Sequence, residues 1–467
     1  MRFQRLSIIY VLSDYLASAI AWTLFYLLRN NFEFGSITAG LNSGDYLTGL
    51  IIIPICWVFL FSLSGFYVIS LKRSRLVELI YSLSVTIPGI FIQFFILLFQ
   101  GFITGNSFYL LFFEYLFLFQ FILTYVPRVL ITSTTAAKVH KGLLGYNTLI
   151  IGSNGKALEL FNKIKNERIP GGNILVGYVS IMNGNEGFLK DYLPHLGPFE
   201  KLPQIISDNK VEEVIIAIEG NEFDTIEKII TLLDFRDVTI KAIPSMKDIL
   251  TGRVKHTSIF GTPLLEISNQ PMPVWQANLK QLMDYLLAIF LLVALSPFIL
   301  LIAVFIRLSG KGPIIFAQER IGKNSKPFTI YKFRSMHPDA ESDTPLLSSK
   351  NDNRITTIGS FMRKHRIDEI PNLINVLKGE MSLVGPRPER LFFIDQITRK
   401  APHYRRLHKV KPGITSWGQV KYGYASDVDS MIERLEYDLL YLENMSLAID
   451  LKIIIYTVII ILKGKGV

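Results

Sequence analysis

The sequence predicts an integral membrane protein in three parts. These are an N-terminal bundle of four transmembrane helices, a Rossmann-like α/β middle domain, and a mainly α-helical C-terminal domain with a re-entrant membrane helix. Three observations support this class. Four apolar runs of about 20 residues, the length that crosses a bilayer, open the chain. Strand-like and helix-like segments then alternate. A fifth apolar run is interrupted by Ser296-Pro297.

The composition agrees with a membrane protein and narrows its partners. The chain has 467 residues, of which 50% are hydrophobic, and a mean hydropathy of +0.34, so it is too apolar for a soluble protein and too long for one domain. Its net charge of +10 favours anionic partners, namely phospholipid headgroups and phosphorylated substrates. Nucleic acid is not expected, because no basic helix or aromatic RNA-binding motif stands out. Cys56, the single cysteine, lies in an apolar run and excludes an intrachain disulfide.

The N-terminal region, residues 1–132, is predicted to cross the lipid bilayer at about residues 6–28, 46–68, 79–100 and 107–127. The first run is too long for a signal peptide and lacks a convincing cleavage site, so it is predicted to remain as a helix. Cations gather in the segments that would face one side: Arg2, Arg5, Lys72, Arg73, Arg75, Arg128, Lys138 and Lys141. The loops on the other side carry only Arg29. The positive-inside rule therefore places the N-terminus, and everything after residue 130, in the cytoplasm.

Residues 145–267 are predicted to form a domain with a parallel, Rossmann-like sheet. Segments such as YNTLIIG, KALELFNKIKN and ILVGYVS alternate between strand and helix patterns. The nucleotide-binding fingerprint is incomplete. Gly152 and Gly155 are present, but Ile150 replaces the first glycine, and no acidic residue ends the second strand, where Val179-Ser180 stands. A structural or regulatory domain is therefore favoured over a dinucleotide-binding one.

The C-terminal domain, residues 275–467, begins with the fifth apolar run, residues 279–308. The run is long enough to cross, but a crossing would export everything downstream, and cations lie at both of its ends: Lys280, Arg307 and Lys311. Proline removes a backbone hydrogen bond and kinks a helix. A helix that enters the bilayer, breaks at Ser296-Pro297 and returns explains both observations. The alternative is a transmembrane helix with a proline kink.

Further membrane contacts are predicted on either side of the polar part of this domain. Residues 311–336 form a basic face, for which attraction to anionic lipid is the simplest interpretation. The segment from Ser430 to Ile454 is predicted as a helix, and the apolar end LKIIIYTVIIIL, closed by Lys463 and Lys465, as an interfacial helix. The histidines of this half show no zinc spacing: His337, His365, His403 and His408.

The most distinctive stretch runs from Arg363 to Pro388, RKHRIDEIPNLINVLKGEMSLVGPRP, where cations flank Asp368 and Glu369. A helix is predicted to begin with Asp368 as its N-cap and to stop at Gly379. One buried face is predicted for Ile370, Leu373, Ile374 and Leu377. A carboxylate can attack phosphorus or hold Mg²⁺, and cations offset phosphate charge. The adjacent acids can therefore divide these tasks; the alternative is a capped helix with a solvated charge cluster.

Several motifs follow one another in the C-terminal half: FAQERIG, YKFRSM, the Arg363–Pro388 stretch, KPGITSWGQV and YDLLYLENMSLAIDLKI. Together they resemble the polyprenyl-phosphate hexose-1-phosphate transferase family of bacterial sugar transferases, and the upstream helices and α/β domain resemble its long form. The resemblance implies a monotopic catalytic domain on the cytoplasmic face of the bacterial inner membrane. It implies transfer of hexose-1-phosphate from a UDP-sugar to undecaprenyl phosphate, with Mg²⁺ and a covalent aspartyl intermediate. This would release UMP and prime capsule, exopolysaccharide or O-antigen assembly; a homodimer is left open.

Site residues follow from the same resemblance. Asp368 would be the nucleophile, and Glu369 would bind the metal together with Asp368. Arg363 and Arg387 match phosphate-binding arginines, and the expected donor contacts are Gln318, Arg320, Lys332 and Arg334. Two departures from the family are His365-Arg366, where small hydroxyl residues are frequent, and the stretch 421–424, which differs from glucose-specific members. The hexose is therefore left open.

Two other functions remain as alternatives. A membrane-bound nucleotide-sugar dehydratase or epimerase would need an intact glycine fingerprint and a Tyr-x-x-x-Lys pair, and the sequence contains neither. A non-enzymatic membrane scaffold for polysaccharide assembly would not need Asp368, Glu369 or Arg387.

Overall fold

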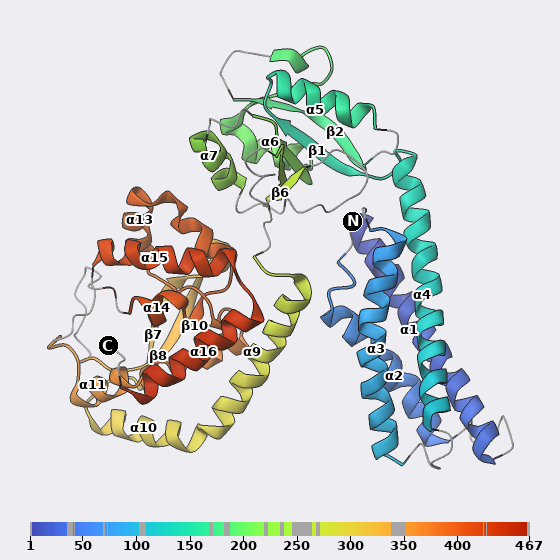
Figure 1. Cartoon of the computed structure of the whole chain (residues 1–467). Coiled ribbons are helices and arrows are strands. Elements are labelled where there is room, and N and C mark those ends of the chain that lie inside the picture. Colours follow the sequence, from blue (N-terminus) through green and yellow to red (C-terminus); the bar gives the residue numbers. More distant parts are fainter. Residues whose placement is uncertain are drawn as a thin grey trace. The chain divides into compact units, whose positions relative to one another are not determined.

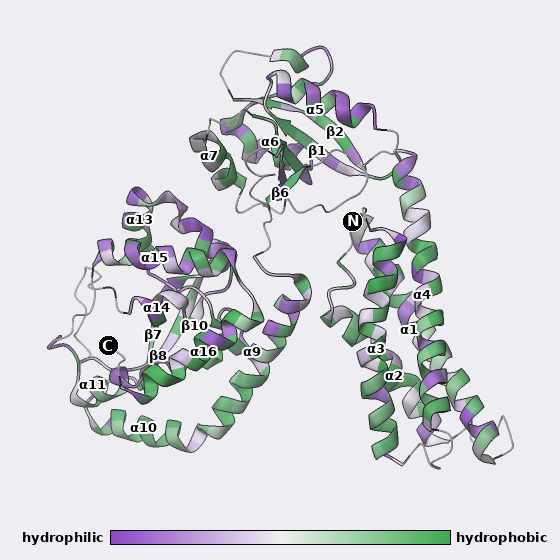
Figure 2. Cartoon of the chain, viewed as in Figure 1, coloured by the Kyte–Doolittle hydropathy of each residue, from purple (hydrophilic) through white to green (hydrophobic). Residues whose placement is uncertain are grey.

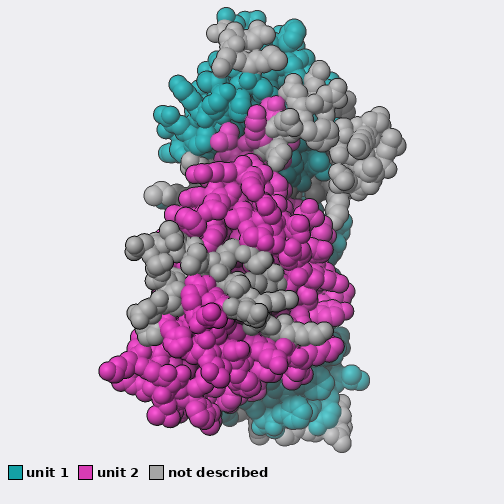
Figure 3. All heavy atoms as spheres, turned by 90° about the vertical axis from the view of Figure 1, so that its left-hand side faces the viewer, with its two compact units in different colours: residues 1–223, 238–267 teal, residues 224–237, 268–467 magenta. Residues whose placement is uncertain are grey.

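The computed structural model contains two compact units, residues 1–223 with 238–267, and residues 224–237 with 268–467 (Figure 3). Each unit is described by itself. The described residues are 2–34, 41, 43–68, 71, 73–101, 109–167, 171–181, 187–218, 223–233, 238–244, 264–267, 271–337, 352–423, 425 and 427–464.

Four long apolar helices open the chain: α1 (Arg2–Phe34), α2 (Gly44–Leu63), α3 (Arg75–Phe99) and α4 (Tyr109–His140). Ser43 and Ser74 cap α2 and α3, because their side chains accept hydrogen bonds from the backbone N–H groups of the first turn. Within the described residues, these four helices and α9 (Val274–Ala294) are long and apolar enough to cross a membrane. In Figure 2 these helices are coloured largely green, the colour of hydrophobic residues.

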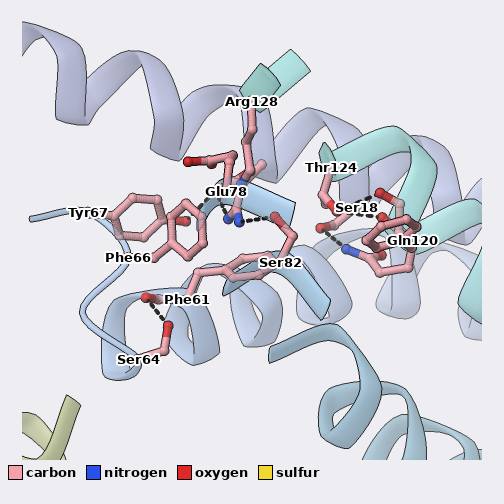
Figure 4. Close-up of polar contacts among 12 residues, drawn as sticks. Ser18, Phe61, Ser64, Phe66, Tyr67, Glu78, Ser82, Gln120, Thr124 and Arg128 are labelled. Carbon is pink, nitrogen blue, oxygen red and sulfur yellow. Dashed lines mark hydrogen bonds and ion pairs between the residues drawn. The ribbon is translucent and has the colours of Figure 1, made fainter. Parts of the chain in front are cut away.

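A buried ion pair joins α1 to α4. Arg128 donates from Nε and Nη2 to the two carboxylate oxygens of Asp14, at 2.8 and 2.6 Å, and both residues are fully buried. The guanidinium also lies over the rings of Phe61 and Phe66, 3.9 and 3.5 Å from their centroids (Figure 4). Arg128 was expected among the cytoplasmic loop cations. That expectation is wrong, because α4 continues to His140 and turns the Arg128 side chain into the bundle.

The α/β domain contains a six-stranded sheet in the order β3-β2-β1-β4-β5-β6 (Figure 1). The pairs are parallel except for β5 with β6, so the predicted Rossmann-like alternation is confirmed as a mixed sheet. The strands are β1 (Tyr146–Ile151), β2 (Asn173–Ser180), β3 (His195–Pro198), β4 (Glu213–Ile216), β5 (Thr239–Ala242) and β6 (Leu265–Ile267). The helices are α5 (Gly155–Lys165) and α6 (Leu202–Asp208), and the 3₁₀ turns are η1 (Gly187–Leu189) and η2 (Phe199–Lys201). Helix α7 (Phe223–Leu233) follows β4 in the chain, and all of it after Phe223 belongs to the other unit.

The glycine after β1 has a packing role. Gly152 has φ +125°, and a Cβ there would come within 2.4 Å of the carbonyl oxygen of Ala217. Phe188 of the turn η1 donates its backbone N–H to the carbonyl oxygen of Ser153 at 3.0 Å. Close packing around the loop thus explains Gly152 without a nucleotide.

The C-terminal domain packs short sheets among helices (Figure 1). Its helices are α9, α10 (Ser296–Leu308), α11 (Thr357–Lys364), α12 (Asn372–Leu377), α13 (Leu391–Lys400), α14 (Trp417–Lys421), α15 (Val428–Glu443) and α16 (Leu447–Leu462). Its strands are β7 (Ile315–Ile321), β8 (Pro327–Phe333), β9 (Ser382–Val384) and β10 (Gly413–Thr415), with 3₁₀ turns η3 (Lys323–Ser325), η4 (Ile367–Glu369) and η5 (Pro402–Lys409).

Two features of this domain differ from expectation. The basic segment 311–336 contains an antiparallel hairpin, β7–β8. The predicted helix from Ser430 to Ile454 is instead two helices, α15 and α16. Helix α15 ends at Glu443 with Asn444 as its C-cap. Ser446 caps α16, because its side chain accepts a hydrogen bond from the backbone N–H of Ile449.

The break in the fifth apolar run lies where the sequence places it. Helix α9 ends at Ala294, and α10 starts at Ser296. The hydroxyl of Ser296 donates to the carbonyl oxygen of Val293 at 2.8 Å, which satisfies one backbone group at the break. Large apolar side chains are exposed on both helices, among them Phe290, Val293 and Leu300, each at least 65% exposed. The run is therefore interrupted and has an extensive apolar surface.

Candidate active site

The acidic pair lies on a tight turn between two helices. After α11 ends at Lys364, Arg366 adopts a left-handed conformation with φ +55°, and the turn η4 then carries Asp368 and Glu369. A left-handed arginine is unusual, because its Cβ crowds the backbone, and such strain is concentrated at functional sites.

The helix predicted to begin at Asp368 begins later. Pro371 is the N-cap of α12, and Asp368 belongs to the preceding 3₁₀ turn, because Arg366 redirects the chain before the helix starts. The expected stop is confirmed, since Gly379 follows the helix with φ +77°.

The predicted buried face of this helix is wrong in part. Ile374 and Leu377 are 41% and 39% exposed, whereas Leu373 and Val376 are buried. The buried side of α12 therefore carries the polar Asn372 and Asn375 together with Leu373 and Val376.

Glu369 is buried among cations. Its Oε1 accepts hydrogen bonds from Nζ of Lys332 at 2.9 Å and from Nη1 of Arg387 at 3.3 Å. Nη1 of Arg366 lies 3.7 Å from Oε2. Burial by itself would raise the pKa of Glu369, but Lys332, Arg366 and Arg387 outweigh burial and lower it. Glu369 is therefore ionised over the physiological pH range.

The neighbouring carboxylate has the opposite shift. Asp368 is also buried, and burial raises its pKa; Lys332 opposes this shift and the charge of Glu369 adds to it. Burial lowers the pKa of Lys332, against the attraction of Glu369. Two adjacent acids with pKa values shifted apart are typical of sites where the two carboxylates have different roles.

A small pocket lies beside these groups. It is lined by Arg320, Ile330, Lys332, Glu369, Asn372, Met381, Arg387, Pro388, Gly413 and Ile414. Three of these residues are cations and one is an acid, so the pocket favours an anion.

Of the other predicted site residues, Arg320 lines this pocket, whereas Gln318 and Arg363 do not. Arg320 donates from Nη2 to Oε1 of Gln318 at 2.6 Å, and its Nη1 lies 3.5 Å from Glu389. Arg363 donates from Nε to the hydroxyl of Ser335 at 2.9 Å. Thus the structure brings Lys332 and Arg387 directly to the acidic pair, and holds the remaining residues through partners of their own.

Arg334 has a further set of contacts. Its guanidinium donates to the carbonyl oxygens of Ile306, Gly310 and Lys311, at 3.0, 2.9 and 2.8 Å. These groups lie at and just after the C-terminal end of α10, so Arg334 joins the end of α10 to the residue that follows β8. A donor contact from Arg334 stays a prediction.

Sequence reasoning missed Glu389, which lies directly after the Pro-Arg-Pro motif. This carboxylate is 4% exposed and faces three arginines: Arg434 at 2.7 Å, Arg320 at 3.5 Å and Arg387 at 3.9 Å. These arginines lower its pKa against the effect of burial. The available signal was a carboxylate two residues beyond Arg387 in a basic region.

The residues can accommodate Mg²⁺, which prefers oxygen ligands and commonly uses one or two carboxylates plus substrate phosphate. Among the described residues there is no cluster of three or more His, Cys, Asp or Glu side chains that could hold a metal. However, Oε2 of Glu369 is buried and accepts no hydrogen bond from any described residue. That oxygen is suited to a cation that shares its coordination with a phosphate.

The C-terminal domain thus combines helices with an exposed apolar surface and a pocket lined by cations and a buried carboxylate, a combination typical of proteins that act on anionic groups at a membrane. Comparison with known proteins gives the family. Residues 275–464 match the family model of the bacterial sugar transferases, and residues 62–244 match a family model described as a CoA-binding domain. The chain belongs to the bacterial sugar transferase family.

Individual relatives agree. The sugar transferase EpsL of Bacillus subtilis (strain 168) is 42% identical over 189 residues, which are 40% of this chain and 90% of that protein. UDP-N-acetylgalactosamine-undecaprenyl-phosphate N-acetylgalactosaminephosphotransferase of Aeromonas hydrophila is 42% identical over 49% of this chain and 53% of its own length. UDP-glucose:undecaprenyl-phosphate glucose-1-phosphate transferase of Xanthomonas campestris pv. campestris is 35% identical over 58% of this chain and 57% of its own length. The chain thus spans little more than half the length of these last two relatives.

Proposed function

We propose that this protein transfers a sugar 1-phosphate from a UDP-sugar to undecaprenyl phosphate, giving undecaprenyl-diphosphate-sugar and UMP. This is the priming step of capsule, exopolysaccharide or O-antigen synthesis. The observation that carries the proposal is a pocket lined by Glu369, Lys332 and Arg387, with the buried Asp368 directly before Glu369 in the chain. Neither rival function, dehydratase or scaffold, requires that arrangement.

The first step is nucleophilic. A carboxylate oxygen of Asp368 attacks the phosphorus that bears the sugar, and the phosphoanhydride bond to UMP breaks as UMP leaves with the electron pair. Lys332, Arg387 and Arg320 offset the charge of the diphosphate and hold it in line. The product on the enzyme is a sugar phosphate esterified to Asp368.

The second step regenerates the enzyme. A phosphate oxygen of undecaprenyl phosphate attacks the same phosphorus, and the Asp368 carboxylate leaves with its electron pair. Two steps suit substrates that arrive from different phases, one from water and one from the bilayer.

Mg²⁺ is proposed as the cofactor, with Glu369 as a principal ligand. When bound, it would neutralise part of the diphosphate charge. Excess EDTA is expected to stop UMP release by the wild-type protein, and added Mg²⁺ to restore it; full activity in EDTA would refute a divalent metal.

The proposed topology has four transmembrane helices, α1 to α4, a re-entrant pair α9–α10, and a cytoplasmic catalytic domain at the inner membrane. Lys280 near the start of α9 pairs with Asp450 at 2.6 Å, and Asp284 accepts from the hydroxyl of Ser382 at 2.6 Å. Arg334 binds the far end of α10. Both ends of the pair are thus bound to one domain, which favours re-entry over a crossing.

Cysteine labelling tests this topology. In a Cys56→Ser background, single cysteines replacing Asn278 or Lys311 should resist an impermeant thiol reagent on intact cells, and react once the membrane is opened. Labelling of Lys311→Cys from outside would show that the segment spans. Cross-linking in membranes would address a homodimer, which we leave as a proposal.

The function is tested by incubating the purified full chain with undecaprenyl phosphate, Mg²⁺ and a series of UDP-sugars, and measuring UMP release. UDP-N-acetylgalactosamine is the first donor to test, because the relative named for it is 42% identical, against 35% for the Xanthomonas relative named for UDP-glucose. No UMP release from any UDP-sugar, with the lipid product also absent, would refute the proposal. The α/β domain is proposed to have a structural or regulatory role.

A further inference from the structure

Two buried oxygen atoms in the pocket lack hydrogen-bond donors. One is Oε2 of Glu369, and the other is Oδ1 of Asn372; neither accepts a hydrogen bond from any described residue. Asn372 is 2% exposed and Glu369 is 7% exposed, and both line the same pocket. Nη1 of Arg366 lies 3.7 Å from Oε2 of Glu369, so that oxygen has a cation nearby but no hydrogen-bond donor. Buried acceptors without a donor are costly, so two of them in one pocket favour a bound group.

The backbone brings these two side chains to one side. Glu369 ends the turn η4, and Asn372 begins α12 three residues later. The two residues between them have helical dihedral angles, φ −56° and ψ −39° at Ile370 and φ −62° and ψ −17° at Pro371. Residues three apart on helical backbone are neighbours on one face.

A second asparagine on the same helix shows what a satisfied amide looks like. Asn375 accepts from the backbone N–H of Tyr331 at 3.2 Å and donates to the carbonyl oxygen of Thr329 and to Glu380, both at 2.7 Å. The fold thus supplies hydrogen-bond partners for both the oxygen and the nitrogen of the Asn375 amide. The amide oxygen of Asn372, about one helical turn away, has no such partner among the described residues.

We infer that Asn372 is a ligand of the divalent cation, which it binds through Oδ1 together with Oε2 of Glu369. The inference rests on the proposed transferase function and adds a ligand to it. The two oxygens of Glu369 then have separate partners, since Oε1 already accepts from Lys332 and Arg387. Carboxylate and amide oxygens are ligands that Mg²⁺ and Mn²⁺ accept, and water and diphosphate oxygens complete such a shell.

This arrangement also clarifies the role of Asp368. With Glu369 and Asn372 supplying the protein ligands, the Asp368 carboxylate is left free to attack phosphorus. A substrate N–H or O–H group is the competing partner for Oδ1 of Asn372. It is less consistent with the pocket, because Oε2 of Glu369 also lacks a hydrogen-bond donor, and one cation can bind both oxygens.

The test measures metal binding directly, apart from turnover. The full chain in detergent or nanodiscs is titrated with Mn²⁺ and followed by electron paramagnetic resonance, with and without UDP. Asn372→Leu removes the oxygen at similar size, and Asn372→Asp keeps an oxygen ligand and adds charge. Gln419→Leu is the matched control, because Oε1 of Gln419 is also buried without a hydrogen bond from the described residues but does not line the pocket.

We expect Asn372→Leu to weaken Mn²⁺ binding about 10- to 100-fold and to raise the Mg²⁺ concentration for half-maximal UMP release in parallel. Asn372→Asp should bind Mn²⁺ at least as tightly as wild type, and Gln419→Leu should match wild type. Unchanged Mn²⁺ affinity in Asn372→Leu would overturn the inference. If that variant does not fold, weaker binding by Asn372→Asp would overturn it.

The result is separable from the proposed function. Failure of the function would appear as wild-type protein that binds Mn²⁺ but releases no UMP. Failure of this inference would appear as normal turnover together with a metal affinity that does not depend on residue 372.

Discussion

Two buried carboxylates of this chain, Asp14 and Glu369, both face arginines but differ in how many of their oxygens accept hydrogen bonds. In the N-terminal helices, both oxygens of Asp14 accept hydrogen bonds from Arg128, and the hydroxyl of Tyr67 adds a third at 2.9 Å. In the C-terminal domain, Glu369 shares one oxygen between Lys332 and Arg387, while the other accepts none from the described residues.

This difference helps to distinguish a buried carboxylate that stabilises the fold from one that can bind a ligand. A saturated pair has no capacity left for a ligand, so its effect is on helix association. A carboxylate that faces several cations, lines a pocket and has one oxygen without a hydrogen-bond donor retains capacity for a ligand. Burial alone does not distinguish the two, because both carboxylates are less than a tenth exposed.

The largest expected effect is at the functional site. Asp368→Asn should fold normally and lower the rate of UMP release more than ~10³-fold, because a carboxamide is a very poor nucleophile toward phosphorus. Turnover is measured with purified protein, and folding is checked by thermal unfolding. Wild-type UMP release by the folded variant would show that Asp368 is not the nucleophile.

The next effect is on stability at the saturated pair. Asp14→Ala leaves the guanidinium of Arg128 buried without its anion, and should destabilise the protein by about 3–5 kcal/mol. Unfolding in detergent measures the change, and activity per folded molecule should stay near that of wild type. Glu78→Gln is the control, because Glu78 is buried in the same region but its carboxylate lies 3.6 Å from Arg73 and accepts no hydrogen bond from the described residues. An equal loss of stability in both variants would remove the distinction.

A smaller effect is expected where a carboxylate orients arginines. Glu389→Gln removes the charge that holds Arg320, Arg387 and Arg434, and a misplaced phosphate-binding group should lower kcat/KM about 10- to 100-fold. Steady-state assays over donor concentration would measure it. Glu433→Gln, on the exposed face of α15, is the matched control and should match wild type. Wild-type kcat/KM in Glu389→Gln would show that the arginines hold their positions without it.

The pH profile sharpens the contrast between the two acids of the site. Burial raises the pKa of Asp368, whereas Lys332, Arg366 and Arg387 keep the pKa of Glu369 low despite burial. The nucleophile must be ionised, so kcat/KM should fall as the pH drops through a pKa above the ordinary aspartate value of about 3.9. Because Glu369 stays ionised there, the acid limb should show one proton. A two-proton limb would mean that both acids titrate together.

Much of the architecture could be predicted from local chemistry. The apolar runs, the break at Ser296-Pro297 and the stop at Gly379 depend on hydropathy or on a single residue's backbone preference, and these act within a few residues. The α/β alternation was visible for the same reason. The β7–β8 hairpin was missed because its cations obscured the strand pattern.

The sequence by itself also singled out the acidic pair and its flanking cations as suited to phosphate chemistry. Their residue types left a capped helix with a solvated charge cluster open, and the role of each residue came from the family resemblance. Only the tertiary structure decided what each charge does. Arg128 binds Asp14 from 114 residues away, and Arg334 holds the end of α10. Burial raises the pKa of Asp368, whereas at Glu369 the cations Lys332, Arg366 and Arg387 outweigh burial and lower the pKa. Which charges meet, and which buried oxygens are left without a donor, depends on the packing of segments distant in sequence, and no local pattern encodes that.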